Sequence, residues 1–294
     1  MSSNRYDRIL RWVLGIAALF IVLFLLSLIR RRPSEAWQER GDGPRIGVVE
    51  IKGVIVNSER AIRQLDQFSR RKDIEAILVD IDSPGGTVAA SQEIYAELCK
   101  IVEKGDKPVI ASLGTVAASG GYYVALAADT IVAGPATTTG SIGVIFEYPV
   151  AADLMDKIGL QVEVIKSGAL KDMGSPYRFP TDSDRRNLQG VVDDLHAQFA
   201  EVVALERNLT PGQVKAVAGG EIFTGKQALD LGLVDILGTF EDAVLLAGRL
   251  TGSMRSPVII RPHERKRVSL WELIFGEDSY ESQTYHHLPQ YLMK

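Results

Sequence analysis

Short apolar segments that alternate with helical patterns most limit how this chain can fold. The strand-like segments occupy residues 46–51, 74–81, 109–113, 130–133 and 162–165. An amphipathic helix is predicted over residues 87–103, between two of these segments. Apolar strands joined by crossover helices predict a largely parallel sheet that is buried on both faces. We therefore expect an α/β fold.

An uncharged run of 18 residues, from Trp12 to Ile29, precedes this α/β pattern. A helix of that length spans about 27 Å at 1.5 Å per residue, enough to cross the hydrocarbon core of a bilayer. Three arginines follow the run where a cleaved signal peptide would have small residues. We therefore predict one retained transmembrane helix.

Charge and composition narrow the classes of partner and cofactor. The net charge of −4 argues against a nucleic-acid partner. The sequence contains no zinc, nucleotide or dinucleotide motif, so we expect no metal and no cofactor. Arginines flank the predicted anchor on both sides, which leaves its orientation open by charge alone. The single cysteine, Cys99, cannot form an intrachain disulfide and does not identify the compartment.

Ser119 is the leading candidate for a nucleophile. It lies in the run Gly114-Thr-Val-Ala-Ala-Ser-Gly-Gly-Tyr-Tyr123, between a predicted strand and an apolar segment that can continue as a helix. A serine at a helix N-terminus meets free N–H groups and the positive end of the helix dipole, which favour developing negative charge. A nucleophile requires that environment, although a tightly packed turn of small residues would have the same composition.

A second glycine-rich turn follows the predicted strand over residues 74–81. It reads Asp82-Ser-Pro-Gly-Gly86, and its two glycines can adopt backbone angles that direct amide groups towards a ligand. An oxyanion hole needs two such donors beside the nucleophile. The amides of Gly86 and Gly120 are the candidates.

The general base is harder to identify, because a serine hydroxyl stays inert until a base accepts its proton. His196 lies within a long helical pattern and has no neighbour that resembles a triad partner, so a solvated helical histidine is the simpler interpretation. Lys171 is a second candidate, since burial lowers the pKa of a lysine. It lies in a loop of small residues, where an ordinary surface charge is equally compatible with the sequence.

Four motifs together resemble the bacterial signal peptide peptidases of the short, single-repeat type, which are membrane-anchored Ser/Lys-dyad proteases. The motifs, in chain order, are Asp82-Ser-Pro-Gly-Gly86, Ala118-Ser-Gly-Gly-Tyr122, Thr139-Gly-Ser-Ile-Gly-Val144 and Lys166-Ser-Gly-Ala-Leu-Lys-Asp172. The resemblance covers residues 45–258. It implies that Ser119 is the nucleophile, that Lys171 is the general base and that Ser141 orients the lysine, with Gly86 as an oxyanion donor.

The resemblance also implies a fold and partners, and together with the uncharged run and the polar segment after it predicts the organisation of the chain. The fold is the crotonase-like or Clp-protease-like superhelix of ββα units. The expected organisation is an N-terminal tail over 1–11, the anchor over 12–29, a linker over 30–44, the protease domain over 45–262 and a C-terminal tail over 263–294. We expect peptide substrates such as signal peptides, a catalytic domain outside the cytoplasm, and a homo-oligomeric ring whose catalytic groove can draw residues from adjacent protomers. The sequence leaves open whether the dyad forms within one protomer or between two.

Two other functions remain open from the residues alone. An acyl-CoA enzyme on the same fold would use the two oxyanion amides to hold a thioester. A catalytically silent membrane scaffold would use its ring to recruit other proteins and would catalyse no reaction. A long helix predicted over residues 181–208 carries an apolar stripe that includes Leu195 and Phe199. That stripe packs either on the domain's own core or against a neighbouring subunit.

Overall fold

The computed structural model describes residue 12 and residues 42–262. The strands are β1 (Arg45–Lys52), β2 (Ala76–Ser83), β3 (Val109–Ala118), β4 (Thr130–Ala133), β5 (Thr138–Gly140), β6 (Ile222–Thr224), β7 (Ile236–Leu237) and β8 (Val258–Ile260). The helices are α2 (Glu59–Arg70), α3 (Val88–Lys104), α4 (Gly120–Ala125), α5 (Ala152–Lys157), α6 (Asp182–Glu206), α7 (Pro211–Val217), α8 (Gly225–Asp230) and α9 (Phe240–Leu250).

The strands form one sheet in the order β6-β5-β3-β2-β1-β8, and β4 pairs with both β3 and β7. Every pairing is parallel except that between β5 and β6, which is antiparallel. The expected mixed α/β domain with a largely parallel sheet is confirmed. Four of the five predicted strands are present, as β1 to β4.

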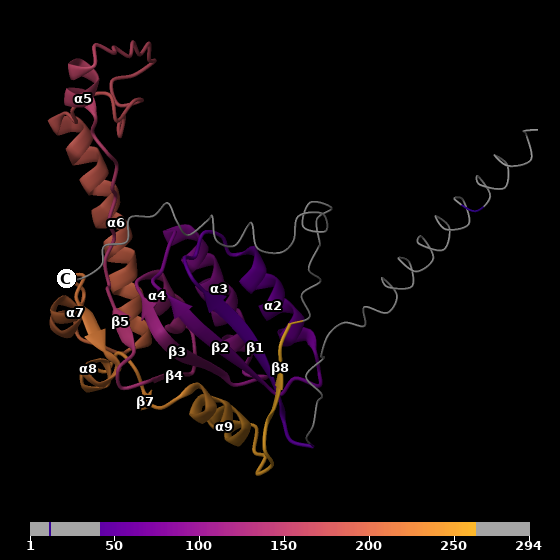
Figure 1. Cartoon of the computed structure of the whole chain (residues 1–294). Helices are drawn as coiled ribbons and strands as arrows, with labels where there is room; N and C mark the ends of the chain where they lie inside the picture. The colour runs from indigo at the N-terminus through magenta and orange to yellow at the C-terminus, as the bar shows by residue number, and fades with distance from the viewer. Residues whose placement is uncertain (1–11, 13–41, 263–294) are drawn as a thin grey trace, which may run out of the picture.

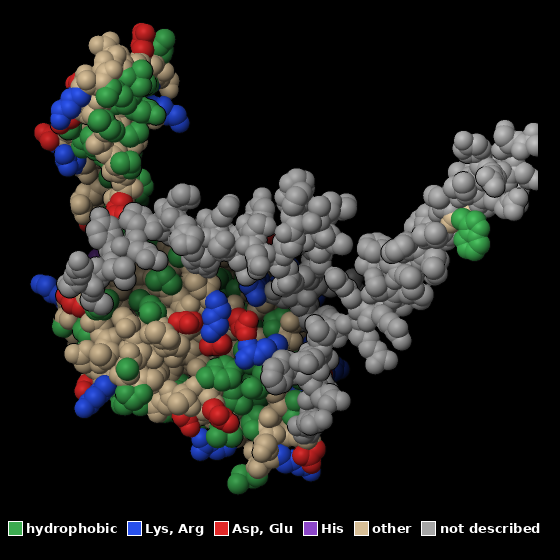
Figure 2. Space-filling view, viewed as in Figure 1, with side chains coloured by type: hydrophobic (Ala, Val, Ile, Leu, Met, Phe, Trp, Pro, Cys, Tyr) green, Lys and Arg blue, Asp and Glu red, His purple; other side chains and the backbone are tan. Residues whose placement is uncertain are grey.

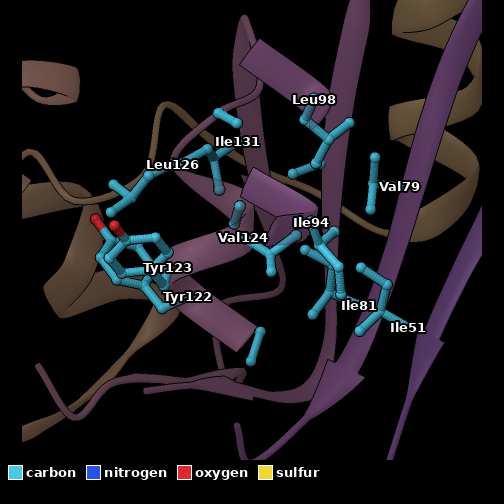
Figure 3. Packing of buried hydrophobic residues seen from close by; sticks show 14 of the residues in the cluster. Ile51, Val79, Ile81, Ile94, Leu98, Tyr122, Tyr123, Val124, Leu126 and Ile131 are labelled. Atoms are coloured by element: carbon cyan, nitrogen blue, oxygen red, sulfur yellow. The ribbon is translucent and has the colours of Figure 1, made fainter. Parts of the chain in front are cut away.

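Helices cover both faces of the sheet, as Figure 1 shows. Side chains alternate between the two faces along β2, so that Ile77, Val79 and Ile81 belong to the larger core and Leu78 to the smaller one. The larger core lies between one face of the sheet and helices α2, α3 and α4, and the smaller core lies between the opposite face and α9. Figure 3 shows Ile94 of α3 and Val124 of α4 among the buried residues of the larger core.

Helix α6 extends well beyond the body of the domain. Its N-terminal half projects away from the sheet, and α5 and the segment between α5 and α6 lie at its far end (Figure 1). We refer to residues 145–192 as the arm. On α6 only Asp184, Phe199 and Val203 are buried, so the predicted stripe packs on the core in its C-terminal half alone.

The predicted strand over residues 162–165 is wrong. These residues lie in the arm without strand structure, and their side chains are exposed. The alternating pattern Gln161-Val-Glu-Val-Ile165 has the period of a strand, but a strand is stable only when a partner satisfies its backbone groups. Within the described part of the chain, no strand pairs with this segment.

The predicted transmembrane helix, residues 12–29, lies outside the described residues except for residue 12. Over residue 12 and residues 42–262, no helix has the length and apolar character needed to cross a membrane. Residues 42–262 begin within the predicted linker and cover the whole predicted protease domain.

Candidate active site

Ser119 occupies the junction between β3 and α4 in a strained backbone conformation. Its φ of 52° and ψ of −120° lie in a region that residues with a side chain rarely adopt. Such a conformation costs about 1–3 kcal/mol and is found mostly at functional sites. A sharp turn from strand to helix with a serine at its centre is also how α/β hydrolases expose a nucleophile.

Three of the four motifs converge at one edge of the sheet because they follow neighbouring parallel strands. The register pairs Ser83 with Ala117 and Ala118 with Gly140. The residues that follow β2, β3 and β5 therefore leave the sheet next to one another. Ser119 and Ser141 are the first residues after β3 and β5, and the edge formed by the carboxyl ends of parallel strands is where α/β proteins bind ligands.

The glycine turn after β2 packs directly against Ser119. Gly85 has a φ of 98°, and a Cβ added to it would lie 2.7 Å from the amide nitrogen of Gly120 and 2.9 Å from Cβ of Ser119. The neighbouring Ile55 pairs with this turn through the Gly85 carbonyl and the Thr87 amide, so the pairing does not use the amide of Gly86. This geometry brings both candidate oxyanion amides, those of Gly86 and Gly120, beside the serine.

A small pocket adjoins these groups, and it is lined by Gly86, Val88, Ser91, Gln92, Ser119, Gly120, Tyr123, Gly143, Val144, Leu195 and Phe199. Part of its apolar wall comes from α6, whose Leu195 and Phe199 lie in the C-terminal half of the apolar stripe. The long helix therefore contributes to the pocket beside the candidate nucleophile. Tyr123 packs edge-on against both Tyr95 and Phe199, with ring centroids 5.1 and 4.9 Å apart. Burial raises the pKa of Tyr123, so this phenol stays neutral at physiological pH.

Lys171 is not brought to Ser119 within one chain. It is exposed and lies between α5 and α6, in the segment at the far end of the arm, whereas α4 lies in the body (Figure 1). Its backbone amide donates to the Gly168 carbonyl across 3.1 Å. Lys171 is absent from the described residues that line the pocket beside Ser119.

Ser141 has a φ of 51°, and its amide donates to the Glu221 carbonyl across 2.7 Å. This bond continues the pairing of β5 with β6, so the chain near residue 221 positions a residue of the candidate site. His196, the alternative base, lies within 2.7 Å of the Ala218 carbonyl through Nε2. That contact joins α6 to the end of α7 and gives the imidazole a structural role.

Sequence analysis missed two groups that shape the site. The Asp82 carboxylate accepts a hydrogen bond from the Val116 amide across 3.0 Å, at the point where the β2–β3 register shifts. Ser91 is buried in the pocket wall, and a Cβ added to Gly120 would lie 2.4 Å from its Oγ. Asp82 begins the first motif and Ser91 faces inward on α3, but neither role is visible without the contacts.

The described residues contain no group of three or more His, Cys, Asp or Glu side chains placed to hold a metal ion.

Comparison with known proteins agrees with the serine-centred geometry. Residues 102–252 match the family described as Peptidase family S49. A Synechocystis protein named as a protease is 45% identical over 209 residues, which cover 71% of this chain and 75% of that protein. The chloroplastic serine protease SPPA of Arabidopsis thaliana is 32% identical over 94% of this chain and 39% of its own length. Protease 4 of Salmonella typhi is 34% identical over 71% of this chain and 35% of its own length.

The chain therefore spans three quarters of the first of these relatives and less than half of the other two. The S49 match covers half of the chain, and it includes Ser119 and the two motifs that follow. This assignment favours a peptidase over the acyl-CoA enzyme and the silent scaffold. The chain belongs to peptidase family S49, the signal peptide peptidase A family of serine proteases.

Proposed function

We propose that this protein is a membrane-anchored endopeptidase with a Ser/Lys dyad, in which Ser119 is the nucleophile and Lys171 the general base. The observation that carries the proposal is the strained conformation of Ser119 at the N-terminus of α4, beside the amides of Gly86 and Gly120. This arrangement has what acyl transfer needs: an accessible oxygen and donors for the oxyanion.

In the proposed mechanism, neutral Lys171 accepts the hydroxyl proton of Ser119 as Oγ bonds to the carbonyl carbon of the scissile peptide. The amides of Gly86 and Gly120 hold the negative oxygen that forms. The C–N bond then breaks, and Lys171 returns its proton to the leaving amine. A water molecule hydrolyses the acyl-enzyme by the same steps, and the Ser141 hydroxyl keeps the lysine oriented.

The position of Lys171 on the arm supports a site to which two protomers contribute. A neighbouring copy would bring the arm, and with it Lys171, to the edge of the sheet where Ser119 lies. The arm carries exposed apolar side chains that a soluble monomer rarely leaves uncovered: Ile145, Phe146, Leu154, Ile158, Leu160, Ile165, Tyr177 and Phe179. Figure 2 shows hydrophobic side chains gathered on the arm. These features support a homo-oligomer, proposed as a ring of superhelical protomers.

The proposed substrates are short or unfolded apolar peptides, signal peptides among them. Support comes from the pocket beside Ser119, whose wall includes the apolar side chains of Val88, Val144 and Leu195. The pocket suits a small apolar side chain next to the scissile bond. The names of relatives such as the Arabidopsis SPPA point to the same class of enzyme. We place the catalytic domain outside the cytoplasm, on a single N-terminal anchor at residues 12–29.

The test compares wild-type protein, Ser119→Ala and Lys171→Ala as full-length chains in detergent, with a fluorogenic apolar peptide as substrate. We expect each substitution to reduce kcat by about 10³-fold or more, because members of a catalytic unit act together. A Lys171→Ala protein with near wild-type activity would refute the dyad. His196→Gln serves as the matched control, and we expect it to retain activity.

Mixing the two inactive variants before assembly tests whether protomers share the site. A shared site is complete only where an intact Ser119 meets an intact Lys171 from the neighbour, so about one quarter of the sites in a random equimolar ring would be active. A site formed within one chain would give no recovery at any ratio. Activity near one quarter of wild type therefore supports the shared site.

A further inference from the structure

The segment that carries Lys171 is held by a cluster of charged side chains centred on Arg178. The Arg178 guanidinium donates two hydrogen bonds to the Asp172 carboxylate, from Nε across 3.0 Å and from Nη2 across 2.8 Å. Lys166 Nζ donates to the same carboxylate across 2.7 Å. Because Asp172 is the residue next to Lys171, these bonds immobilise the backbone immediately beside the proposed base.

Arg178 also binds the first turn of α6. Its Nη1 donates to Oδ2 of Asp184 across 2.5 Å. The Asp184 side chain is only 1% exposed. The same oxygen accepts from the Thr181 amide across 2.8 Å, and the Thr181 hydroxyl accepts from the Asp184 amide across 3.1 Å, which completes a capping box. Arg178 therefore bridges the Lys171 segment and a rigid helix end.

The chemistry of this bridge favours a positioning role. A guanidinium can bind one carboxylate through two parallel hydrogen bonds and a second carboxylate through a third. It thereby fixes the distance and the relative orientation of the two carboxylates, which a lysine ammonium cannot do. Residues 156–171 are exposed and have no strand partner among the described residues. Without Arg178, we expect the segment to lose its fixed relation to α6.

We propose that Arg178 is a positioning residue for catalysis, which docks the Lys171 segment onto the N-terminus of α6 so that the arm presents the base in one orientation. This inference rests on the proposed role of Lys171. Arg178 lies outside the four motifs. Asp184 is the residue of α6 through which Arg178 holds the Lys171 segment.

The test measures kcat, KM and the pH dependence of kcat for wild type, Arg178→Gln, Arg178→Lys and Asp172→Asn, as full-length assembled protein. Arg186→Gln is the matched control, since Arg186 is exposed on the same turn of α6 and donates to Ser183 of its own helix. We expect Arg178→Gln to reduce kcat about 10- to 100-fold at neutral pH with KM nearly unchanged. Arg178→Lys should restore little of this loss, and Arg186→Gln should behave like wild type.

The pH profile separates positioning from a general loss of structure. A base that is no longer held in its site is better solvated and stays protonated to higher pH, so the deficit of Arg178→Gln should be largest near neutrality and shrink as the pH rises. A deficit that is the same at every pH, or full activity, would overturn the proposal. The double variant with Asp172→Asn should lose less than the product of the two single losses, because both changes break the Arg178–Asp172 bonds.

Lys171→Ala is measured in parallel so that the two proposals can fail separately. If Lys171→Ala is active, the dyad is wrong, whatever Arg178→Gln does. If Lys171→Ala is inactive while Arg178→Gln matches wild type in kcat and in pH profile, the dyad stands and only the positioning role is wrong. Size-exclusion mass measurement of every variant ensures that assembled proteins are compared.

Discussion

The Ser119 amide donates a hydrogen bond to the Gly140 carbonyl, with 2.9 Å between nitrogen and oxygen. This bond extends the parallel β3–β5 pairing by one residue and holds Ser119 beside Ser141 where both chains leave the sheet. Both residues have positive φ values, 52° and 51°. The neighbouring strand therefore helps to hold the proposed nucleophile in its strained conformation.

Replacing Ser119 should separate stability from activity. Ser119→Gly removes the hydroxyl and relieves the strain, whereas Ser119→Ala removes the hydroxyl and keeps the strained φ. We expect both to be inactive, and we expect the glycine variant to be the more stable by about 1 kcal/mol. Thermal unfolding of the two variants under identical conditions provides the comparison. An alanine variant as stable as the glycine variant would show that the turn is not strained.

Gly85→Ala should be much more damaging than an alanine at another left-handed glycine. A Cβ at residue 85 would collide with the Gly120 amide, and the φ of 98° is unfavourable for alanine. We expect a loss of about 2–5 kcal/mol in the free energy of unfolding, together with loss of activity. Gly105, with a φ of 66° and open space around it, is the control. Gly105→Ala should cost about 1–2 kcal/mol and leave kcat unchanged, as chemical denaturation and peptide hydrolysis would report.

Charging the apolar surface of the arm should prevent assembly. Ile165 is 95% exposed in one chain, and Met254, in the turn between α9 and β8, is 98% exposed. We expect Ile165→Glu to reduce the assembled mass and to lower activity by about tenfold or more, since burying an unpaired charge at an interface is costly. Met254→Glu should change neither property. Light scattering coupled to size-exclusion chromatography measures the mass, and equal behaviour of the two variants would argue against the arm as an interface.

The contribution of Asp184 to the free energy of unfolding should persist at mildly acidic pH. The Arg178 guanidinium, with help from the Thr181 amide, holds the pKa of the Asp184 carboxyl well below its usual range. A carboxyl with a depressed folded-state pKa stabilises the fold at every pH above its unfolded-state value of about 3.9, and the contribution is lost as the pH falls through the folded-state value. The difference in unfolding free energy between wild type and Asp184→Asn should therefore stay constant from pH 8 to about 5 and shrink only below about pH 4. Urea unfolding across this range tests the prediction.

Asp182→Asn is the control for that experiment, since Asp182 lies exposed in the same first turn of α6. We expect its effect on stability to be small at every pH. A wild-type advantage over Asp184→Asn that already declines between pH 7 and pH 5 would contradict the assignment of the effect to the Arg178–Asp184 pair.

Much of the fold follows from local patterns in the sequence. Strands β1 to β4 include short apolar segments whose composition predicts burial, and α3 has an amphipathic pattern that ends at Gly105. The strand predicted over residues 162–165 is wrong, because its pattern is that of a strand but no strand of the described residues pairs with it. Periodicity indicates what a segment can form, and pairing determines whether it forms.

The candidate site, like the fold, could be predicted from the sequence only in part. By itself, the sequence determined the candidate groups: a serine at a strand–helix junction, glycine-rich turns and a lysine in a fourth motif, all of them short-range features of composition and order. Only the tertiary structure decided which of these groups meet. Parallel pairing brings the ends of β2, β3 and β5 to one edge, because strand register is a long-range property. The arm keeps Lys171 away from that edge within one chain, because α6 extends beyond the body and carries the Lys171 segment at its far end.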